Sequence, residues 1–124
     1  MLDYINKEMN FYIELFSKIP VYVLLLLSAA SVISGDYFAK FWSTNRKTVF
    51  LALALLSYVL SAVFYTPTLL RQGLVTTSVI WSLLSIIGFV FIGVVIFKET
   101  LTGTQTVGVT TGIVALIILT YSLK

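Results

Sequence analysis

The stretch from Leu74 to Phe97 reads LVTTSVIWSLLSIIGFVFIGVVIF and contains no charged side chain. A helix needs about 20 apolar residues to cross a hydrocarbon core of about 30 Å, and this stretch is long enough. Three further apolar stretches of similar length lie at about 20–42, 48–70 and 103–122. Strands that cross membranes are about half as long and alternate apolar with polar residues, which these stretches do not. The pattern therefore predicts an all-α integral membrane protein with four transmembrane helices.

The composition also indicates a chain that lies mostly in hydrocarbon. Of the 124 residues, 59% are hydrophobic and 10% are charged, whereas a water-soluble domain has about 25% charged residues. The net charge of +3 is spread along the chain, which argues against a nucleic-acid surface. The chain has no cysteine and no histidine, so disulfides, zinc sites built on these residues and Ser-His-Asp catalysis are excluded. We therefore expect neither an enzyme nor a cofactor or metal site.

The N-terminal segment, 1–18, shows the spacing of an amphipathic helix. Its apolar face consists of Leu2, Ile5, Met9, Tyr12, Ile13 and Phe16. Its polar face consists of Asp3, Lys7, Asn10, Glu14 and Ser17. Such a helix is suited to lie in the headgroup layer beside the first transmembrane helix, and the alternative is a soluble cap packed on the loops. The chain thus divides into this amphipathic helix and a transmembrane domain, 19–124.

Two segments near the third apolar stretch, SVIWS at 78–82 and IFKETLT at 96–102, form a pattern of moderate specificity. Together they resemble the third helix and the following loop of the small multidrug resistance transporters, in the drug/metabolite transporter superfamily. The similarity continues in one register over about 22–122 and includes Gly35 and Tyr58. The resemblance implies the four-helix fold of that family, a dimer, and a multi-pass protein of a bacterial or archaeal cytoplasmic membrane.

The chain departs from the family at the positions that carry its chemistry. Val32 stands where the family has a first-helix glutamate that binds protons and cationic substrates, and Ser78 replaces the third-helix tyrosine. The resemblance therefore implies the fold but not proton-coupled export of drug-like cations. We predict a small transporter that works as a dimer by alternating access on an unidentified substrate. The alternative is a non-transporting accessory or structural subunit of a larger membrane complex or of a paired homologue.

Asp36 is the only carboxylate inside an apolar stretch, and ionisable groups there are functional candidates by default. It lies one helical turn after Val32, where it would bind a cation or a proton. The alternative is an ion pair at the membrane interface with Lys40, four residues later. If the first three helices converge, Asp36 joins a substrate site with three further side chains, Tyr58, Ser78 and Trp81. The third stretch carries Ser78, Ser82 and Ser85 on the face of Trp81, and plain interhelical packing of this face is the competing interpretation.

The fourth stretch carries small residues at helical spacing, Gly108 and Gly112, with Ala115 extending the same face. Such a face lets two helices approach closely, so we predict a homodimer through it, with packing inside one chain as the alternative. Basic residues divide evenly between the two predicted sides of the membrane, which allows an antiparallel pair. The expected partners are therefore the lipid bilayer and a second copy or another membrane protein.

Overall fold

The computed structural model describes residues 1–122, and every regular element in that part of the chain is helical. The helices are α1 (Leu2–Ser17), α2 (Val21–Asn45), α3 (Thr48–Tyr65), α4 (Leu74–Phe91) and α5 (Gly103–Ser122). A 3₁₀ helix, η1 (Thr66–Leu70), continues α3, and a π-helical turn, η2 (Ile92–Ile96), continues α4. With these continuations, α2 to α5 are each long and apolar enough to cross a membrane. The prediction of four long apolar helices is confirmed, with bounds that agree to within a few residues.

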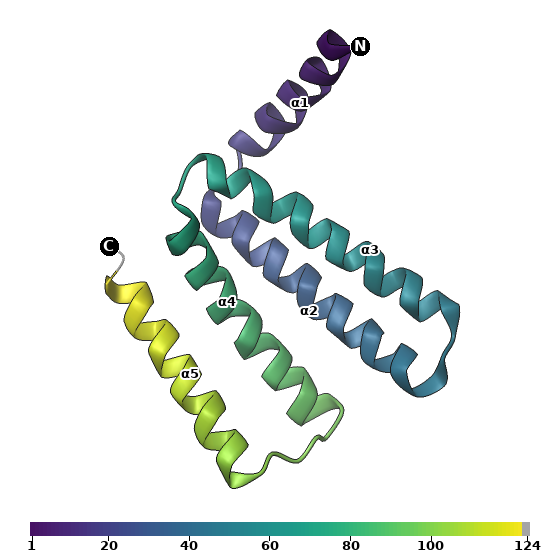
Figure 1. Cartoon of the computed structure of the whole chain (residues 1–124), viewed down its shortest axis with the longest axis vertical. Coiled ribbons are helices and arrows are strands. Elements are labelled where there is room, and N and C mark those ends of the chain that lie inside the picture. The colour runs from purple at the N-terminus through teal and green to yellow at the C-terminus, as the bar shows by residue number, and fades with distance from the viewer. Residues whose placement is uncertain (123–124) are drawn as a thin grey trace.

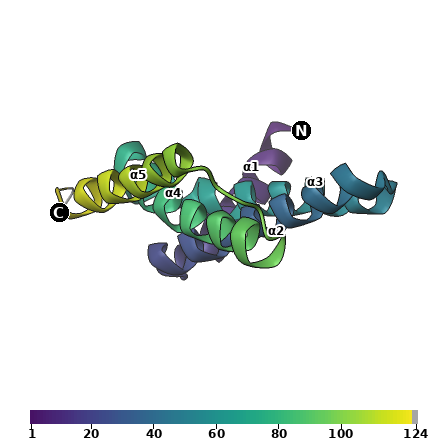
Figure 2. The same cartoon turned by 90° about the horizontal axis from the view of Figure 1, so that it is seen from below.

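The four long helices stand side by side in the order α3, α2, α4 and α5 (Figure 1). Seen from below in Figure 2, the four helices form a flattened row, with α3 at one end and α5 at the other. Helix α2 packs against both α3 and α4, whereas α5 packs chiefly on α4. Along the helix axes, the turns after α2 and after α4 lie at one end, and η1 lies at the opposite end (Figure 1). This arrangement makes α2 the centre of the fold.

Glycines bring α2 close to both of its neighbours. A Cβ atom added at Gly35 of α2 would lie 2.6 Å from Cε1 of Tyr58 in α3. A Cβ atom added at Gly88 of α4 would collide with the side chain of Ile33 in α2. Close approach of this kind supplies the van der Waals contacts that hold helices together in lipid, where apolar burial gives little driving force. Both interfaces therefore depend on a residue without a side chain.

Large apolar side chains cover the outer faces of the row. Leu56, Phe91 and Ile118 are 57%, 58% and 62% exposed, and the fully buried apolar residues are few. Water-soluble monomers rarely expose contiguous apolar surface on this scale, because it drives association. Hydrocarbon is the solvent that such faces require. The four long apolar helices and their exposed faces therefore indicate a multi-pass membrane protein.

Helix α1 points away from the row and touches it only near its own C-terminal end (Figure 1). The hydroxyl of Tyr12 donates a hydrogen bond of 2.5 Å to the carbonyl of Val63 in α3. Burial raises the pKa of Tyr12, which keeps this hydroxyl a donor. The guanidinium of Arg71 donates to the carbonyls of Phe16 and Ile19, at 3.2 and 2.6 Å. These bonds fix the C-terminal end of α1 beside η1.

The rest of α1 is not packed against the loops. Leu2, Ile5 and Met9, on its predicted apolar face, are exposed. A soluble cap would bury this face against the chain, and an interfacial helix would present it to lipid. The exposed face therefore favours the interfacial interpretation.

Replacing Gly88 with leucine tests the contact between α2 and α4. Overpacking of this kind costs about 1–3 kcal/mol, so we expect a loss of that size in the free energy of unfolding, measured by titration with a denaturing detergent. The control is Gly103→Leu, because a Cβ atom there meets nothing within 4 Å. Adding Ile33→Ala to Gly88→Leu should restore stability; a full effect in the control would contradict this account.

Candidate functional site

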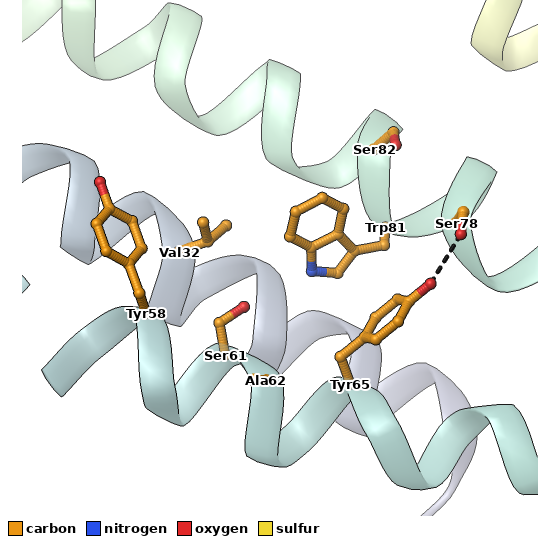
Figure 3. Close-up of a pocket in the computed structure, with 8 residues that line it drawn as sticks. All are labelled: Val32, Tyr58, Ser61, Ala62, Tyr65, Ser78, Trp81 and Ser82. Atoms are coloured by element: carbon orange, nitrogen blue, oxygen red, sulfur yellow. Dashed lines mark hydrogen bonds between the residues drawn. The ribbon is translucent and has the colours of Figure 1, made fainter. Parts of the chain in front are cut away.

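A cavity of about 500 Å³ lies between α3 and α4, with α2 behind it (Figure 3). Eight side chains line it: Val32 from α2; Tyr58, Ser61, Ala62 and Tyr65 from α3; and Ser78, Trp81 and Ser82 from α4. All three helices are among those that are apolar and long enough to span a membrane, so the cavity lies between candidate membrane spans. Ala62 is exposed, which shows that the cavity opens to the surface. Its volume is in the range of sites that hold small molecules.

Ser28 joins the three helices behind the cavity. Its hydroxyl is 2.8 Å from the carbonyl of Ser61, and the Ser61 hydroxyl donates in return to the carbonyl of Ser28 at 2.9 Å. The indole Nε1 of Trp81 donates to the Ser28 hydroxyl, also at 2.9 Å. Ser28 and Ser61 are buried, so these bonds form without competition from water. The network ties α2 to α3 and fixes the position of the Trp81 ring.

Tyr65 links the two walls of the cavity. Its hydroxyl lies 2.7 Å from the hydroxyl of Ser78, across the space between α3 and α4 (Figure 3). Its ring meets the Trp81 ring edge to face, with the centroids 5.8 Å apart. This geometry is the favoured one for aromatic pairs. Tyr65 therefore bounds the cavity on the side where η1 begins.

Asp36 lies beside the cavity rather than in it. The hydroxyl of Tyr58 donates a hydrogen bond of 2.7 Å to Oδ1 of Asp36. Gly35 makes this contact possible, because any side chain at that position would displace the Tyr58 ring. Tyr58 itself lines the cavity. The phenol thus connects the carboxylate to the cavity wall.

A second cavity of about 320 Å³ adjoins the far side of Asp36. Its lining includes Asp36, Lys40, Gly93 and Glu99. Nζ of Lys40 lies 3.4 Å from Oε1 of Glu99, so the ion pair of this lysine joins α2 to the loop after η2. An ion pair between Lys40 and Asp36 was the alternative from sequence, and the structure instead gives each a different partner.

The structure therefore brings three of the four predicted site residues into one cavity: Tyr58, Ser78 and Trp81. The fourth, Asp36, reaches them through its bond to Tyr58. Val32 also lines the cavity, and no lining residue is a carboxylate. Ser28 was missed, although its spacing of seven residues before Gly35 puts both on one face of α2.

Comparison with known proteins gives no relative of this chain. No protein-family model, no curated protein and no solved structure matches it. The resemblance to the small multidrug resistance transporters therefore stays a prediction, which rests on the sequence motifs quoted above. What the site does is argued from its own geometry.

The residues predicted for dimerisation lie on α5, away from the cavity. A Cβ atom added at Gly108 or at Gly112 would meet nothing within 4 Å. Gly108 and Ala115 are exposed. Packing of these small residues against another helix of the same chain, the alternative interpretation, is not what the described residues show. The face is uncovered in a single chain.

Two further polar side chains are buried in α4 without a partner. Within residues 1–122, the hydroxyls of Thr77 and Ser85 form no hydrogen bond, although both residues are almost completely buried. Neither lines the cavity. The same part of the chain holds no group of three acidic side chains that would bind a metal ion. The chemistry of the site is therefore that of hydroxyls, aromatic rings and the carboxylate of Asp36.

Replacing Ser28 with alanine tests the network behind the cavity. Interhelical hydrogen bonds in membranes contribute about 0.6 kcal/mol on average and up to about 1.7, and this change removes more than one of them. We expect a loss of about 1–2 kcal/mol in the free energy of unfolding. In a Trp42→Phe background, the emission of Trp81 should also shift, because its indole N–H loses its acceptor.

The matched control is Ser31→Ala on the same helix. The Ser31 hydroxyl bonds only to the carbonyl of Leu27, one turn earlier in its own helix. The Ser31→Ala variant should therefore have a free energy of unfolding and a Trp81 emission close to those of the parent. An unchanged emission in the Ser28 variant would show that Ser28 does not position Trp81.

Proposed function

We propose that this chain is a small membrane transporter of the small multidrug resistance type, in which a dimer moves a solute across the bilayer by alternating access. The observation that carries the proposal is the open cavity at membrane depth, walled by hydroxyls and aromatic rings. Helices that only pack against lipid have no need of such a cavity, because a buried polar surface in hydrocarbon is costly. The sequence resemblance supports the same class.

Asp36 is the proposed coupling group. A carboxylate at this depth is expensive to keep charged, so binding a proton or a cation there releases free energy. When Asp36 is ionised, it holds the Tyr58 hydroxyl in a charge-assisted hydrogen bond. Protonation weakens that bond and frees the Tyr58 ring to move in the cavity wall. In this way one carboxylate outside the cavity controls the shape of the cavity.

Besides the bond between Trp81 and Ser28, two polar ties join α4 and its following loop to the other helices, one near each end of the helices. The bond between Tyr65 and Ser78 joins α3 to α4, and the ion pair between Lys40 and Glu99 joins α2 to the loop after η2. Alternating access requires that the cavity open toward one side while it closes toward the other. Breaking one tie while keeping the other lets α4 pivot against α2. This pair of ties is therefore suited to act as the two gates.

The geometry of a single chain supports the proposal of a dimer. A row of helices, with α5 held chiefly by α4, encloses no aqueous path of its own. The uncovered glycine face of α5 offers a surface on which a second copy packs closely. Two copies would then surround a shared path with two cavities.

Asp36→Asn tests the coupling role. The purified chain is reconstituted into liposomes with a trapped pH-sensitive dye, and a panel of small solutes is applied to find those that drive proton movement. We expect the variant to lose about tenfold or more of the solute-driven proton flux, since the amide cannot carry a proton. Asp3→Asn, the same change on exposed α1, should keep the flux of the parent.

The outcomes of this experiment separate the parts of the proposal. Full, still proton-dependent transport by the Asp36 variant would remove Asp36 from the coupling role and leave the transporter. A panel in which no solute moves, with or without protons, would count against transport itself.

The second candidate is the accessory subunit, and one observation favours it. Most of α1 extends from the row with its apolar residues uncovered, as a contact element for another membrane protein would. The oligomeric state distinguishes the two functions. A transporter of this size needs a stable homodimer, whereas an accessory subunit would pair with a different chain.

Cysteine cross-linking tests the homodimer directly, because the natural chain contains no cysteine. A single cysteine at Ala115, on the glycine face of α5, should form a cross-linked dimer in lipid on mild oxidation. Ile117→Cys is the control, since two residues further along a helix the side chain points to the opposite side. No cross-link at either position, together with co-purification of another membrane protein, would favour the accessory subunit.

A further inference from the structure

The cavity between α3 and α4 has no charged side chain among the described residues that line it. Three aromatic rings, those of Tyr58, Tyr65 and Trp81, form much of its wall. The remaining polar groups are the hydroxyls of Ser61, Ser78 and Ser82. Such a lining offers flat apolar surface and neutral hydrogen-bonding atoms. It offers nothing that would balance the charge of an ion.

The carboxylate of Asp36 is not among the residues that line the cavity. Asp36 lines the second cavity, and one of its oxygens already accepts a hydrogen bond from the Tyr58 hydroxyl. The two other charges in that second cavity, on Lys40 and Glu99, are paired with each other. Val32 occupies the wall one turn before Asp36. A cation in the first cavity would therefore find no counter-charge among the residues that line it, which is unfavourable in a space of low dielectric constant.

The hydrogen-bonding groups of the wall are arranged to leave specific atoms free. The N–H of Trp81 is used by Ser28, so the ring offers its face and no donor. Within residues 1–122, the hydroxyl of Ser82 takes part in no hydrogen bond to protein, and it lies on the same helix one residue after Trp81 (Figure 3). A ligand that stacks on the indole thus finds a free hydroxyl beside it. Ser82 is half-buried, and a ligand that supplies a hydrogen bond to its hydroxyl gains from that contact.

We propose that this cavity selects an uncharged, planar amphiphile: an aromatic molecule that carries a hydroxyl or carbonyl group and enters from the membrane. The ring stacks on Trp81 between the two tyrosines, and its polar group bonds to Ser82. The proposal deepens the transporter function and rests on it, because it assigns the solute to the neutral cavity and the proton to Asp36. Because the solute and the proton bind at separate places, the carboxylate of Asp36 lies behind Tyr58 rather than in the wall of the cavity.

Two probes of nearly equal shape test the selection. The neutral probe is 3-tert-butylphenol, and the cationic probe is its trimethylammonium isostere, 3-(trimethylammonio)phenol. The chain carries two tryptophans, so Trp42→Phe leaves Trp81 as the sole reporter in the cavity wall. Quenching of its emission is followed in bilayer discs of zwitterionic lipid. The free probe concentration is set by dialysis against empty discs, which removes the effect of lipid partitioning.

We expect saturable quenching by the neutral probe, with a dissociation constant about tenfold or more below that of the cationic isostere. Ala62→Phe fills the cavity and should weaken the neutral probe by about tenfold. Ala52→Phe, the same change at an exposed position of α3, is its control. Ser82→Ala, which removes only one hydroxyl and leaves the packing intact, should weaken the phenol by a few-fold through the loss of one hydrogen bond.

Equal or tighter binding of the cation would overturn the proposal and would indicate that the aromatic faces attract cations directly. Saturable binding of neither probe would overturn it as well, as would equal effects of Ala62→Phe and Ala52→Phe. These outcomes are distinct from failure of the transporter function. The loss or retention of proton flux in the Asp36 variant is measured with solutes found independently of these probes.

Discussion

In hydrocarbon, the hydrogen bonds of Ser28 hold α2, α3 and α4 together, and the cavity and its neighbouring carboxylate depend on this arrangement. Apolar burial gives little preference for one helix partner over another in lipid, so close contacts and polar bonds between helices decide the arrangement. Ser28 supplies bonds to both neighbours of α2, through Ser61 in α3 and Trp81 in α4. Gly35 and Gly88 supply the close contacts on the same helix pairs. The cavity exists because α2 holds both α3 and α4, while α3 contacts α4 through the side chain of Tyr65.

This constraint explains how a chain with so few charges organises its polar groups. Three charged side chains, those of Asp36, Lys40 and Glu99, line a common space in the second cavity. The first cavity is lined by neutral hydroxyls and aromatic rings. The Tyr58 phenol connects the two, because it lines the neutral cavity and donates to the carboxylate of Asp36. The separation of charge from the aromatic site is a property of the helix packing and not of any single residue.

Much of the fold was predictable from the sequence because its signals are local. Apolar length alone locates the four long helices, and helical spacing alone identifies the amphipathic α1. The site was only partly predictable. The partner of Asp36 depends on which face of α2 meets α3, and an acid with a lysine four residues later favours an ion pair on any isolated helix. Ser28 was missed because serines in apolar helices commonly bond to their own backbone, as Ser31 does.

The bonds that Arg71 makes to Phe16 and Ile19 have a consequence for the synthesis of the protein. These contacts join segments more than 50 residues apart in the chain, with α2 and α3 between them. Helix α1 is therefore made before α2 and α3 but acquires its anchor only after these two helices have been inserted. From that moment it and the loop before α4 belong to the same face of the bilayer. Any later change in the orientation of the chain has to carry both of them across together.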